Sequence, residues 1–417
     1  MSKSLFYIDS IENRTKSYDD LLNDVNSTKS YNSYFRSNSY YSVFLNIIVS
    51  ILLEKEIIIL DNDFSEKEIE ILIGFNDLET KQENLTIEEI DKLQVNSIEE
   101  LLKKINNVDY NWKISLFTSG TTGLPKKVSH TFETITRFVK RSTAHLSDVW
   151  GFAYNPTHIA GIQVFFQALL NQNLIIRLFG LSQTLFFEQV EKFQVSHISA
   201  TPTFFRLIYS DNLVLPSVKH ITIGGEKLDK KIVEKLKLMM PDASFTNVYA
   251  STEAGSLFAS KDDAFIIKEE FKNMVKVEKF ELLINKCLLA QSDDLKLAGE
   301  WYHTGDIVEI METEPLKIRF ISRKNEMINV GGYKVNPAEV EDAIRSISGV
   351  SDVRVYAKPN SVLGNLICCE IVSVNDEVTE KRVRLYLTEV LQDFKIPRLI
   401  HFVDRLDLTR TGKVIRN

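Results

Sequence analysis

The sequence predicts an α/β protein: a large N-terminal domain with mostly parallel sheets flanked by helices, followed by a small α+β domain. Apolar strands alternate with amphipathic helices between residues 150 and 250, and this pattern changes to hairpins and single helices near residue 322. A chain of 417 residues, 44% of them hydrophobic, is long enough for two hydrophobic cores. We therefore predict domains at residues 1–322 and 323–417.

The N-terminal region predicts a helix and strand, followed by surface helices. Residues 40–53 are almost wholly apolar, but Glu54-Lys55-Glu56 ends the run before the about 20 residues that a membrane span needs. We expect a buried helix there and a strand at 57–60. In the charged region that follows, residues 86–93 and 97–105 predict surface helices.

The middle of the chain predicts a parallel sheet with helices on both faces. The predicted helices are 132–141, 158–170, 185–193 and 228–240, and the predicted strands are 174–179, 196–200, 221–223 and 245–249. Ligands of such sheets bind beyond the carboxyl ends of the strands. Gly224-Gly225-Glu226 and Tyr249-Ala250-Ser251-Thr252-Glu253 follow two of these strands, so we expect both at the site.

The C-terminal region predicts the small α+β domain. It contains a glycine-containing hairpin at 327–335, a helix that begins at Pro337, strands at 350–357 and 366–374, and a helix at about 379–391.

The composition of the chain argues against several classes of function. A formal net charge of −7 argues against a general nucleic-acid binder. Three poorly spaced cysteines argue against a disulfide framework or a zinc site. The N-terminus lacks the apolar region of a signal peptide, so we expect a cytoplasmic protein without a membrane span.

A glycine-rich segment follows the strand-like residues 114–117. It contains the hydroxyl-bearing Thr118, Ser119, Thr121 and Thr122, with Gly120 among them and Lys126 at its end. Glycines let backbone N–H groups approach an anion, and the lysine adds positive charge. The segment predicts a polyphosphate site, although its spacing differs from G-x-x-x-x-G-K-[ST].

Four further segments contain groups suited to a nucleotide. Tyr249 can stack on a base, Thr252 can bond a phosphate, Glu253 can bind Mg²⁺, and Asp306 can accept both ribose hydroxyls. The other two segments are residues 321–341, with Gly331-Gly332, and 408–413 near the end of the chain. Taken singly, a Ser-Thr-Glu triplet is more often a turn or a helix cap, and two glycines are a hairpin turn.

Together and in this order, the five segments resemble the adenylate-forming superfamily of acyl- and aryl-CoA synthetases, peptide-synthetase adenylation domains and luciferases. The resemblance covers residues from about 113 to 417 and is nearest to short bacterial acyl- or aryl-acid–CoA ligases. It implies an AMP-forming acid–thiol ligase. A carboxylic acid would attack the α-phosphate of ATP, with Mg²⁺, giving an acyl-adenylate and pyrophosphate. CoA or a carrier's phosphopantetheine would then take the acyl group.

The resemblance also implies residue roles. The phosphate cradle is Thr118, Ser119, Gly120, Thr121, Thr122 and Lys126. The catalytic residues are Lys413, Thr252 and Glu253, with Glu253 also the metal ligand. The other nucleotide residues are Gly224, Gly225, Glu226, Tyr249, Ser251, Asp306 and Arg323. The acid would be bound by His158, Gly161, Gly224 and Ala250. The small domain would be mobile, with Asn325 as its hinge and Gly331 and Gly332 lining a thiol channel.

The sequence departs from the family at several positions. Lys127 stands where a glycine is common, and Ala250 replaces the usual glycine. The N-terminal domain is also trimmed at its start. His158 either gates the acid site or caps an apolar helix. Amino-acid-activating relatives carry an Asp near this region, but no candidate Asp follows residues 160–162, where the sequence has Gln163; this favours an acyl or aryl acid.

Two alternative functions stay open. One is a stand-alone adenylation enzyme that loads an acyl carrier protein with an amino acid. The other is a non-catalytic member of the fold. An NAD-dependent oxidoreductase is excluded because no G-x-G-x-x-G follows an early strand.

Overall fold

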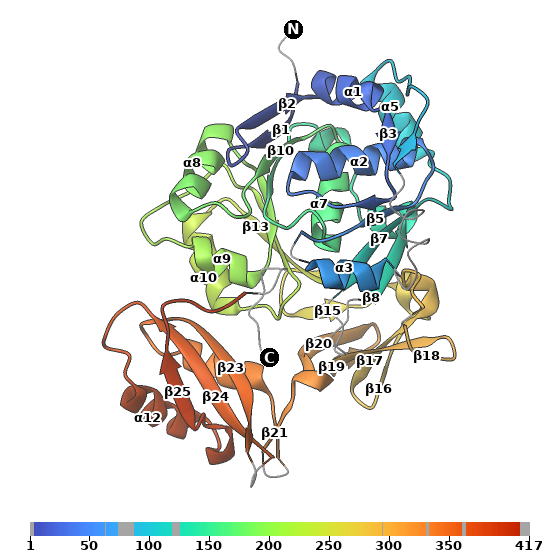
Figure 1. Ribbon diagram of the computed structural model, residues 1–417. Helices are drawn as coiled ribbons and strands as arrows, with labels where there is room; N and C mark the ends of the chain where they lie inside the picture. Colours follow the sequence, from blue (N-terminus) through green and yellow to red (C-terminus); the bar gives the residue numbers. More distant parts are fainter. Residues whose placement is uncertain are drawn as a thin grey trace. The chain divides into compact units, whose positions relative to one another are not determined.

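The computed structural model describes residues 4–62, 64–73, 87–118, 126–293, 295–330, 333–360 and 364–408 (Figure 1). It forms two compact units. The first comprises Met1–Pro202, Ile208–Asp262 and Asn285–Leu297, and the second comprises Thr203–Leu207, Asp263–Ile284 and Ala298–Asn417. The domain boundary between residues 322 and 323 stays a prediction.

The first unit contains an eight-stranded sheet with the order β14-β13-β12-β11-β9-β10-β1-β2. Its strands are β14 (Gly255–Ser260), β13 (Ser244–Ser251), β12 (His220–Gly224), β11 (His197–Ala200), β9 (Val149–Phe152), β10 (Leu174–Arg177), β1 (Leu5–Asp9) and β2 (Arg14–Ser17). The six strands from β13 to β1 are parallel, and only the edge strands β14 and β2 are antiparallel. The predicted mostly parallel sheet is confirmed.

Two smaller sheets complete the strands of this unit. A four-stranded sheet has the order β4 (Tyr34–Phe35), β5 (Ile57–Ile59), β7 (Lys113–Thr118) and β8 (Lys126–Thr131). A two-stranded sheet pairs β3 (Ser30–Tyr31) with β6 (Glu88–Glu89).

Helices cover these sheets. They are α1 (Tyr18–Ser27), α2 (Tyr40–Leu52), α3 (Glu66–Leu72), α5 (Ile98–Asn106), α6 (Phe132–Thr136), α7 (Ile159–Leu169), α8 (Gln183–Phe193) and α10 (Lys230–Met239), with the short η1 (Thr143–His145) and η3 (Lys286–Leu288). Most of α9 (Pro202–Ile208) is assigned to the second unit. Several begin at a capping side chain: Ser17 and Asp20 form a capping box on α1, and Ser97 caps α5.

The main core lies around α2 and α7. In Figure 1, α2 and α7 lie between the strands of the eight-stranded sheet and β5 and β7 of the four-stranded sheet. Phe44 of α2 stacks on Phe165 of α7 with ring centroids 4.5 Å apart, and both are fully buried. The buried helix predicted at residues 40–53 is therefore confirmed as α2. In the described parts of the chain, no helix has the length and apolar character that a bilayer span requires.

Two local predictions are wrong. The helix predicted at residues 86–93 is absent from the described residues 87–93, because Glu88 and Glu89 pair with Ser30 and Tyr31 as a strand. The backbone N–H of Ile90 donates to the carbonyl of Lys29, which continues this extended pairing. The helix predicted at 132–141 is shorter and ends at Thr136.

The second unit contains two sheets. The sheet that includes residues 264–323 is antiparallel along β15 (Ala264–Ile266), β20 (Leu316–Arg323), β19 (Trp301–Thr313), β17 (Glu281–Asn285) and β16 (Val275–Glu278), and β18 (Leu297–Ala298) pairs with β19. The short helices η2 (Glu269–Phe271) and η4 (Lys324–Glu326) flank its strands. The sequence pattern did not predict this sheet.

The predicted α+β arrangement is confirmed further along the chain. Its sheet has the order β22 (Tyr333–Val335), β21 (Ile328–Val330), β24 (Gly364–Ser373) and β23 (Val350–Asn360), with β25 (Leu399–Phe402) paired to β24. The helices are α11 (Pro337–Arg345), α12 (Glu380–Val390) and the short η5 (Asp393–Lys395). Asn336 caps α11 and Pro337 occupies its first turn, which explains where this helix begins.

Candidate functional site

The carboxyl ends of β9, β11, β12 and β13 lie along one edge of the eight-stranded sheet, because these strands are parallel neighbours. Gly224 ends β12 beside Val248 of β13, and a Cβ at Gly224 would lie 3.0 Å from the Val248 carbonyl oxygen. Gly225 follows with a φ of +80°, a conformation that favours glycine. The sequence therefore placed this glycine pair correctly at the edge where ligands of parallel sheets bind.

The order in which strands are added to the sheet switches sides at β9, because β10 lies on one side of β9 and the next strand, β11, lies on the other. Such switch points open a crevice beyond the strand ends. Tyr154, just after β9, lies there, with its hydroxyl 3.3 Å from the hydroxyl of Ser199 on β11. Burial, with a smaller contribution from the Glu226 carboxylate, raises the pKa of Tyr154 to about 12. Tyr154 stays a neutral hydrogen-bonding group, and the sequence analysis did not identify it.

The hairpin of β7 and β8 supports the glycine-rich segment, since Thr118 pairs with Lys126 at the end of the strands that this segment connects. Successive side chains of a strand point to opposite faces. Lys127 forms an ion pair with Glu56 at 2.9 Å, and Glu56 also accepts a hydrogen bond from Ser115. Burial acts to raise the pKa of Glu56, but these two partners outweigh it and lower the pKa. Lys127 is therefore held on one face of β8, and Lys126 lies on the other.

His130 lies on the same face of β8 as Lys126 and is fully buried. Its Nε2 is 2.7 Å from the carbonyl oxygen of Thr252, and its Nδ1 is 3.2 Å from the Thr134 hydroxyl. Because a carbonyl only accepts, Nε2 carries the hydrogen. Burial lowers the pKa of His130 to about 4, so the ring is neutral at physiological pH. The histidine thus fixes the Thr252 backbone to the strand that leaves the glycine-rich segment.

Further hydrogen bonds hold the turn that contains Thr252 and Glu253. The N–H of Ala290 donates to the Glu253 carbonyl at 2.7 Å, and the N–H of Ala254 donates to the Ser251 hydroxyl at 3.2 Å. Arg137 donates to the carbonyl of Ala254 at 3.5 Å and to that of Leu288 at 3.2 Å. Ser251 therefore supports the turn in this structure. His130 and Arg137 were both missed by the sequence analysis.

Tyr249 lies on β13 just before this turn. Its ring stacks on Phe258 of β14, with centroids 5.6 Å apart and planes inclined by 14°. Ala250 follows at an irregularity in the β13–β14 pairing, where the register shifts after Tyr249. The side chains of both residues are partly exposed.

The residues predicted to bind the acid have partners of their own. His158 is the N-cap residue of α7, but its side chain does not cap the helix. Its Nε2 lies 3.2 Å from Asp61, which follows β5 and also accepts from the Thr157 hydroxyl at 3.2 Å. A Cβ at Gly161 would lie 2.5 Å from the Asn155 carbonyl oxygen, so close packing requires this glycine.

Gln163 of α7 also has a structural role. Its side chain accepts a hydrogen bond from the Ser256 hydroxyl at 2.9 Å and donates to the Ile135 carbonyl at 3.4 Å. Gln163 therefore joins α7 to β14 and α6.

In the second unit, Asp306 and Arg323 face each other in the β19–β20 pairing. The Nε of Arg323 donates to the Asp306 carboxylate at 2.8 Å, and Asp306 is only 4% exposed. The neighbouring Gly305 N–H donates to Glu281, which also contacts His303 and Lys324. Burial opposes ionisation of Glu281, but these donors lower its pKa. The two residues assigned to the ribose by resemblance are thus brought together.

Several predicted residues lie outside the described residues. They are Ser119, Gly120, Thr121, Thr122, Gly331, Gly332 and Lys413. The backbone of Thr118 ends β7 and that of Asn325 lies in η4, but their side chains are also outside the description. The roles of all nine stay predictions.

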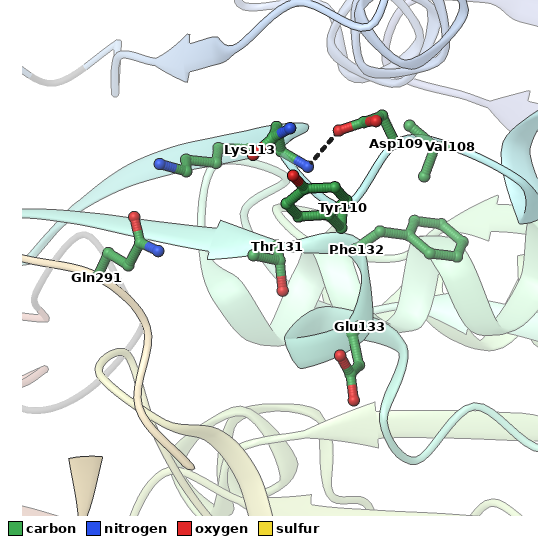
Figure 2. Close-up of a pocket in the computed structure, with 9 residues that line it drawn as sticks. Val108, Asp109, Tyr110, Lys113, Thr131, Phe132, Glu133 and Gln291 are labelled. Atoms are coloured by element: carbon green, nitrogen blue, oxygen red, sulfur yellow. Dashed lines mark hydrogen bonds between the residues drawn. The ribbon is translucent and has the colours of Figure 1, made fainter. Parts of the chain in front are cut away.

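A pocket of about 360 Å³ lies at the other end of the β7–β8 hairpin (Figure 2). Lys113, Tyr110, Thr131, Glu133 and Gln291 are among its lining residues. Lys113 pairs with Thr131, whereas the glycine-rich segment joins the opposite ends of these strands. No residue predicted for the site lines this pocket.

The fold and these residues define an α/β protein with a ligand-binding edge at its parallel strands, the architecture of adenylate-forming enzymes. The sequence matches the AMP-binding enzyme family over residues 55–274 and the AMP-binding enzyme C-terminal domain over residues 339–413. The chain therefore belongs to the AMP-binding enzyme family, and the predicted resemblance is confirmed.

Individual relatives agree with this assignment. A 2-succinylbenzoate–CoA ligase of Lactococcus lactis is 23% identical over 72% of this chain and 68% of its own length. The ligase of the same name from Staphylococcus epidermidis is 25% identical over 83% of this chain and 74% of its own. One similar solved structure is that of o-succinylbenzoate CoA synthetase (MenE) from Bacillus subtilis in complex with the acyl-adenylate intermediate OSB-AMP. It has a TM-score of 0.71 and 17% sequence identity, and the match covers 99% of this chain and 94% of that one. MatB from Rhodopseudomonas palustris, bound to ATP, has a TM-score of 0.73 at 16% identity with the same coverage. The two structures establish the likeness of fold.

Proposed function

We propose that this chain activates a carboxylic acid with ATP, forming an acyl-adenylate and pyrophosphate, and then transfers the acyl group to the thiol of CoA. The observation that carries the proposal is the hydrogen bond from His130 to the Thr252 carbonyl. It joins the strand leaving the glycine-rich segment to the Thr252-Glu253 turn. By resemblance, these two segments bind the phosphates and the magnesium ion of one nucleotide, so a rigid connection between them suits the reaction.

Lys126 and Thr252 have side chains suited to binding phosphate. In the described part of the chain, neither the Lys126 ammonium nor the Thr252 hydroxyl bonds another protein group. Lys126 lies on the face of β8 that carries His130, whose ring contacts Thr252. Nucleotidyl transfer depends on neutralising and aligning charge, so we assign the phosphates to this lysine and the α-phosphate contact to the Thr252 hydroxyl.

Glu253 fits the role of magnesium ligand. Its carboxylate is partly exposed, and it forms no hydrogen bond or ion pair with other described residues, while its carbonyl is held by Ala290. Mg²⁺ prefers such hard carboxylate oxygens and retains several waters. A bound Mg²⁺ would offset phosphate charge, and the Ala290 hydrogen bond would keep Glu253 oriented toward it.

The ribose and the reacting carboxylate are assigned to the C-terminal motifs. Arg323 orients the Asp306 carboxylate, which we propose accepts both ribose hydroxyls. Lys413 would bridge the acid's carboxylate and the α-phosphate in the first step and withdraw for the second.

For the acid, we propose an aryl acid of the 2-succinylbenzoate class. The support is the activity named for the relatives at 23% and 25% identity. Gln163 agrees with it, because a neutral amide engaged by Ser256 cannot pair with the ammonium of an amino acid. An acyl carrier protein is the alternative acceptor. We also propose a cytoplasmic location, since Cys287, Cys368 and Cys369 are all free thiols.

The experiment is a direct product assay. The purified chain is incubated with 2-succinylbenzoate, ATP, Mg²⁺ and CoA, and mass spectrometry follows the CoA thioester and AMP. The proposal predicts the CoA thioester and AMP in equal amounts. Neither product should form when CoA and the acid are omitted. Production of ADP in place of AMP would contradict it. AMP without a thioester, restored to a thioester by a phosphopantetheinylated carrier, would replace CoA as the acceptor.

A further inference from the structure

His145, Asp148 and His197 form a cluster at the edge of the eight-stranded sheet opposite the candidate site. His145 ends η1, Asp148 precedes β9, and His197 begins β11, so all three lie at the amino ends of parallel strands. The Nδ1 of His145 is 2.9 Å from Asp148 Oδ2, and the Nε2 of His197 is 3.5 Å from the same oxygen. The three donor atoms lie within 4.8 Å of one another.

The hydrogen bonds of Ser196 position the imidazole ring of His197. The Ser196 hydroxyl accepts from the N–H of Val149 at 2.9 Å and donates to the Val149 carbonyl at 3.3 Å. The same hydroxyl lies 2.8 Å from His197 Nδ1 and holds that side of the ring. The other ring nitrogen, Nε2, therefore faces the Asp148 carboxylate at 3.5 Å, and it is the nitrogen available to a cation bound between them.

The backbone around the cluster is held in place. Asn173, which is 1% exposed, donates from its side chain to the His145 carbonyl at 2.7 Å. The Tyr18 hydroxyl in turn donates to the Asn173 carbonyl at 2.9 Å. His197 is only 8% exposed, whereas 28% of the His145 side chain is exposed, which leaves one side open to water. The donors are thus preorganised on a rigid edge with room for a solvent ligand.

From this geometry we propose that His145, Asp148 and His197 bind a zinc ion through Nδ1, Oδ2 and Nε2. Zinc takes imidazole nitrogens and carboxylate oxygens tetrahedrally, and bonds of about 2.0–2.1 Å place neighbouring donors about 3.3 Å apart. The 3.5 Å separation of Asp148 and His197 matches that spacing, and the 2.9 Å separation of His145 and Asp148 needs to open by a few tenths of an ångström. Water takes the fourth position.

The donor set distinguishes this ion from the magnesium proposed for the nucleotide. Two imidazoles suit zinc and similar transition ions, whereas Mg²⁺ prefers oxygen ligands. The bound zinc ties η1 to the amino ends of β9 and β11. It therefore stabilises the folded chain without ATP or acid, and the proposal stands or falls independently of the proposed function.

The test is calorimetric titration of the full chain with ZnCl₂ in excess Mg²⁺, with ATP and acid left out. We expect one saturable zinc site, at least a tenfold weaker affinity in His145→Gln and Asp148→Asn, and zinc-dependent thermal stabilisation only where the site is intact. His220→Gln is the matched control, because His220 stacks on His197 at 4.5 Å but offers no donor to the cluster. It should change the affinity less than threefold.

Three results would overturn the proposal. They are no saturable zinc binding by the wild type, unchanged affinity in both ligand variants, or an equal loss in His220→Gln. Circular dichroism of each zinc-free variant checks that it is folded. His145 is partly exposed, so His145→Gln supplies the decisive comparison if Asp148→Asn fails to fold.

Discussion

His130→Phe is the substitution that tests how the candidate nucleotide site is assembled. Phenylalanine fills the space of the imidazole but cannot donate to the Thr252 carbonyl, which His130 contacts at 2.7 Å. His130 is fully buried, so water does not replace the lost donor. Leaving a buried acceptor without a partner costs about 1–3 kcal/mol. A loss of that size corresponds to about 5- to 150-fold in an equilibrium constant.

The same substitution should reduce activity, because it frees the turn containing Thr252 and Glu253. Small misplacements of a reacting group can cost about 100-fold in rate. We therefore expect kcat/KM for acid-dependent pyrophosphate exchange to fall by about 10- to 100-fold, with the urea midpoint of unfolding also lowered. His130→Gln should recover much of both, because the glutamine amide nitrogen reaches the position of Nε2. The reasoning is refuted if His130→Phe matches the wild type in exchange and in unfolding.

The lowered pKa of His130 predicts how the stability of the folded chain depends on pH. Its pKa is about 4 in the folded chain, against 6.5 for an unperturbed histidine, so the unfolded chain binds the proton first as pH falls. The stabilising contribution is complete above pH 6.5 and is lost between 6.5 and 4, about 3 kcal/mol in all. His130→Phe should flatten the stability profile in that window. If the stability of His130→Phe fell as steeply with pH as that of the wild type, His130 would not be the group responsible.

Four further substitutions test individual assignments. Asp306→Ala should weaken ATP binding at least tenfold by calorimetry, and an unchanged dissociation constant would exclude Asp306 from the site. Lys126→Ala should raise the KM for ATP about tenfold. Lys127→Ala loses only a part-exposed ion pair with Glu56, worth about 0–1 kcal/mol, and should leave the KM within twofold of the wild type. Equal effects of the two substitutions on the KM would contradict the assignment of these lysines to opposite faces of β8. Lys413→Ala should abolish adenylate formation but spare thiol transfer from preformed acyl-AMP, and equal loss in both steps would remove its role. Gly161→Ala places a Cβ 2.5 Å from a carbonyl oxygen and should lower stability by about 1–3 kcal/mol, so a thermal melt identical to the wild type's would contradict the packing.

The positions of Gly224 and Tyr249 could be predicted from the sequence because each lies near the carboxyl end of a strand in a parallel sheet. Strand direction places such residues at one edge without any knowledge of contacts. The buried helix α2 was predictable for a similar local reason, since its apolar run stops at charged residues.

His130 and the antiparallel sheet of the second unit were not predictable in this way. The only local signal for His130 is its alternation with Val128, which marks the buried face of β8. Its partner Thr252 is 122 residues away, and that distance in sequence hides the contact. The sheet formed by β16, β17, β19 and β20 depends on pairing between strands whose exposed residues follow no clear hydrophobic alternation. The close packing of Gly161 against Asn155 was likewise not predictable from the local sequence, and its role at the acid site stays a prediction.

The most direct test of the central claim is carboxylate-dependent exchange of labelled pyrophosphate into ATP, measured across aryl, acyl and amino acids. The account predicts exchange with 2-succinylbenzoate or a similar aryl acid, dependence on Mg²⁺, and loss of exchange in Lys413→Ala. Intact ATP binding with no exchange for any acid, or exchange confined to amino acids, would contradict it.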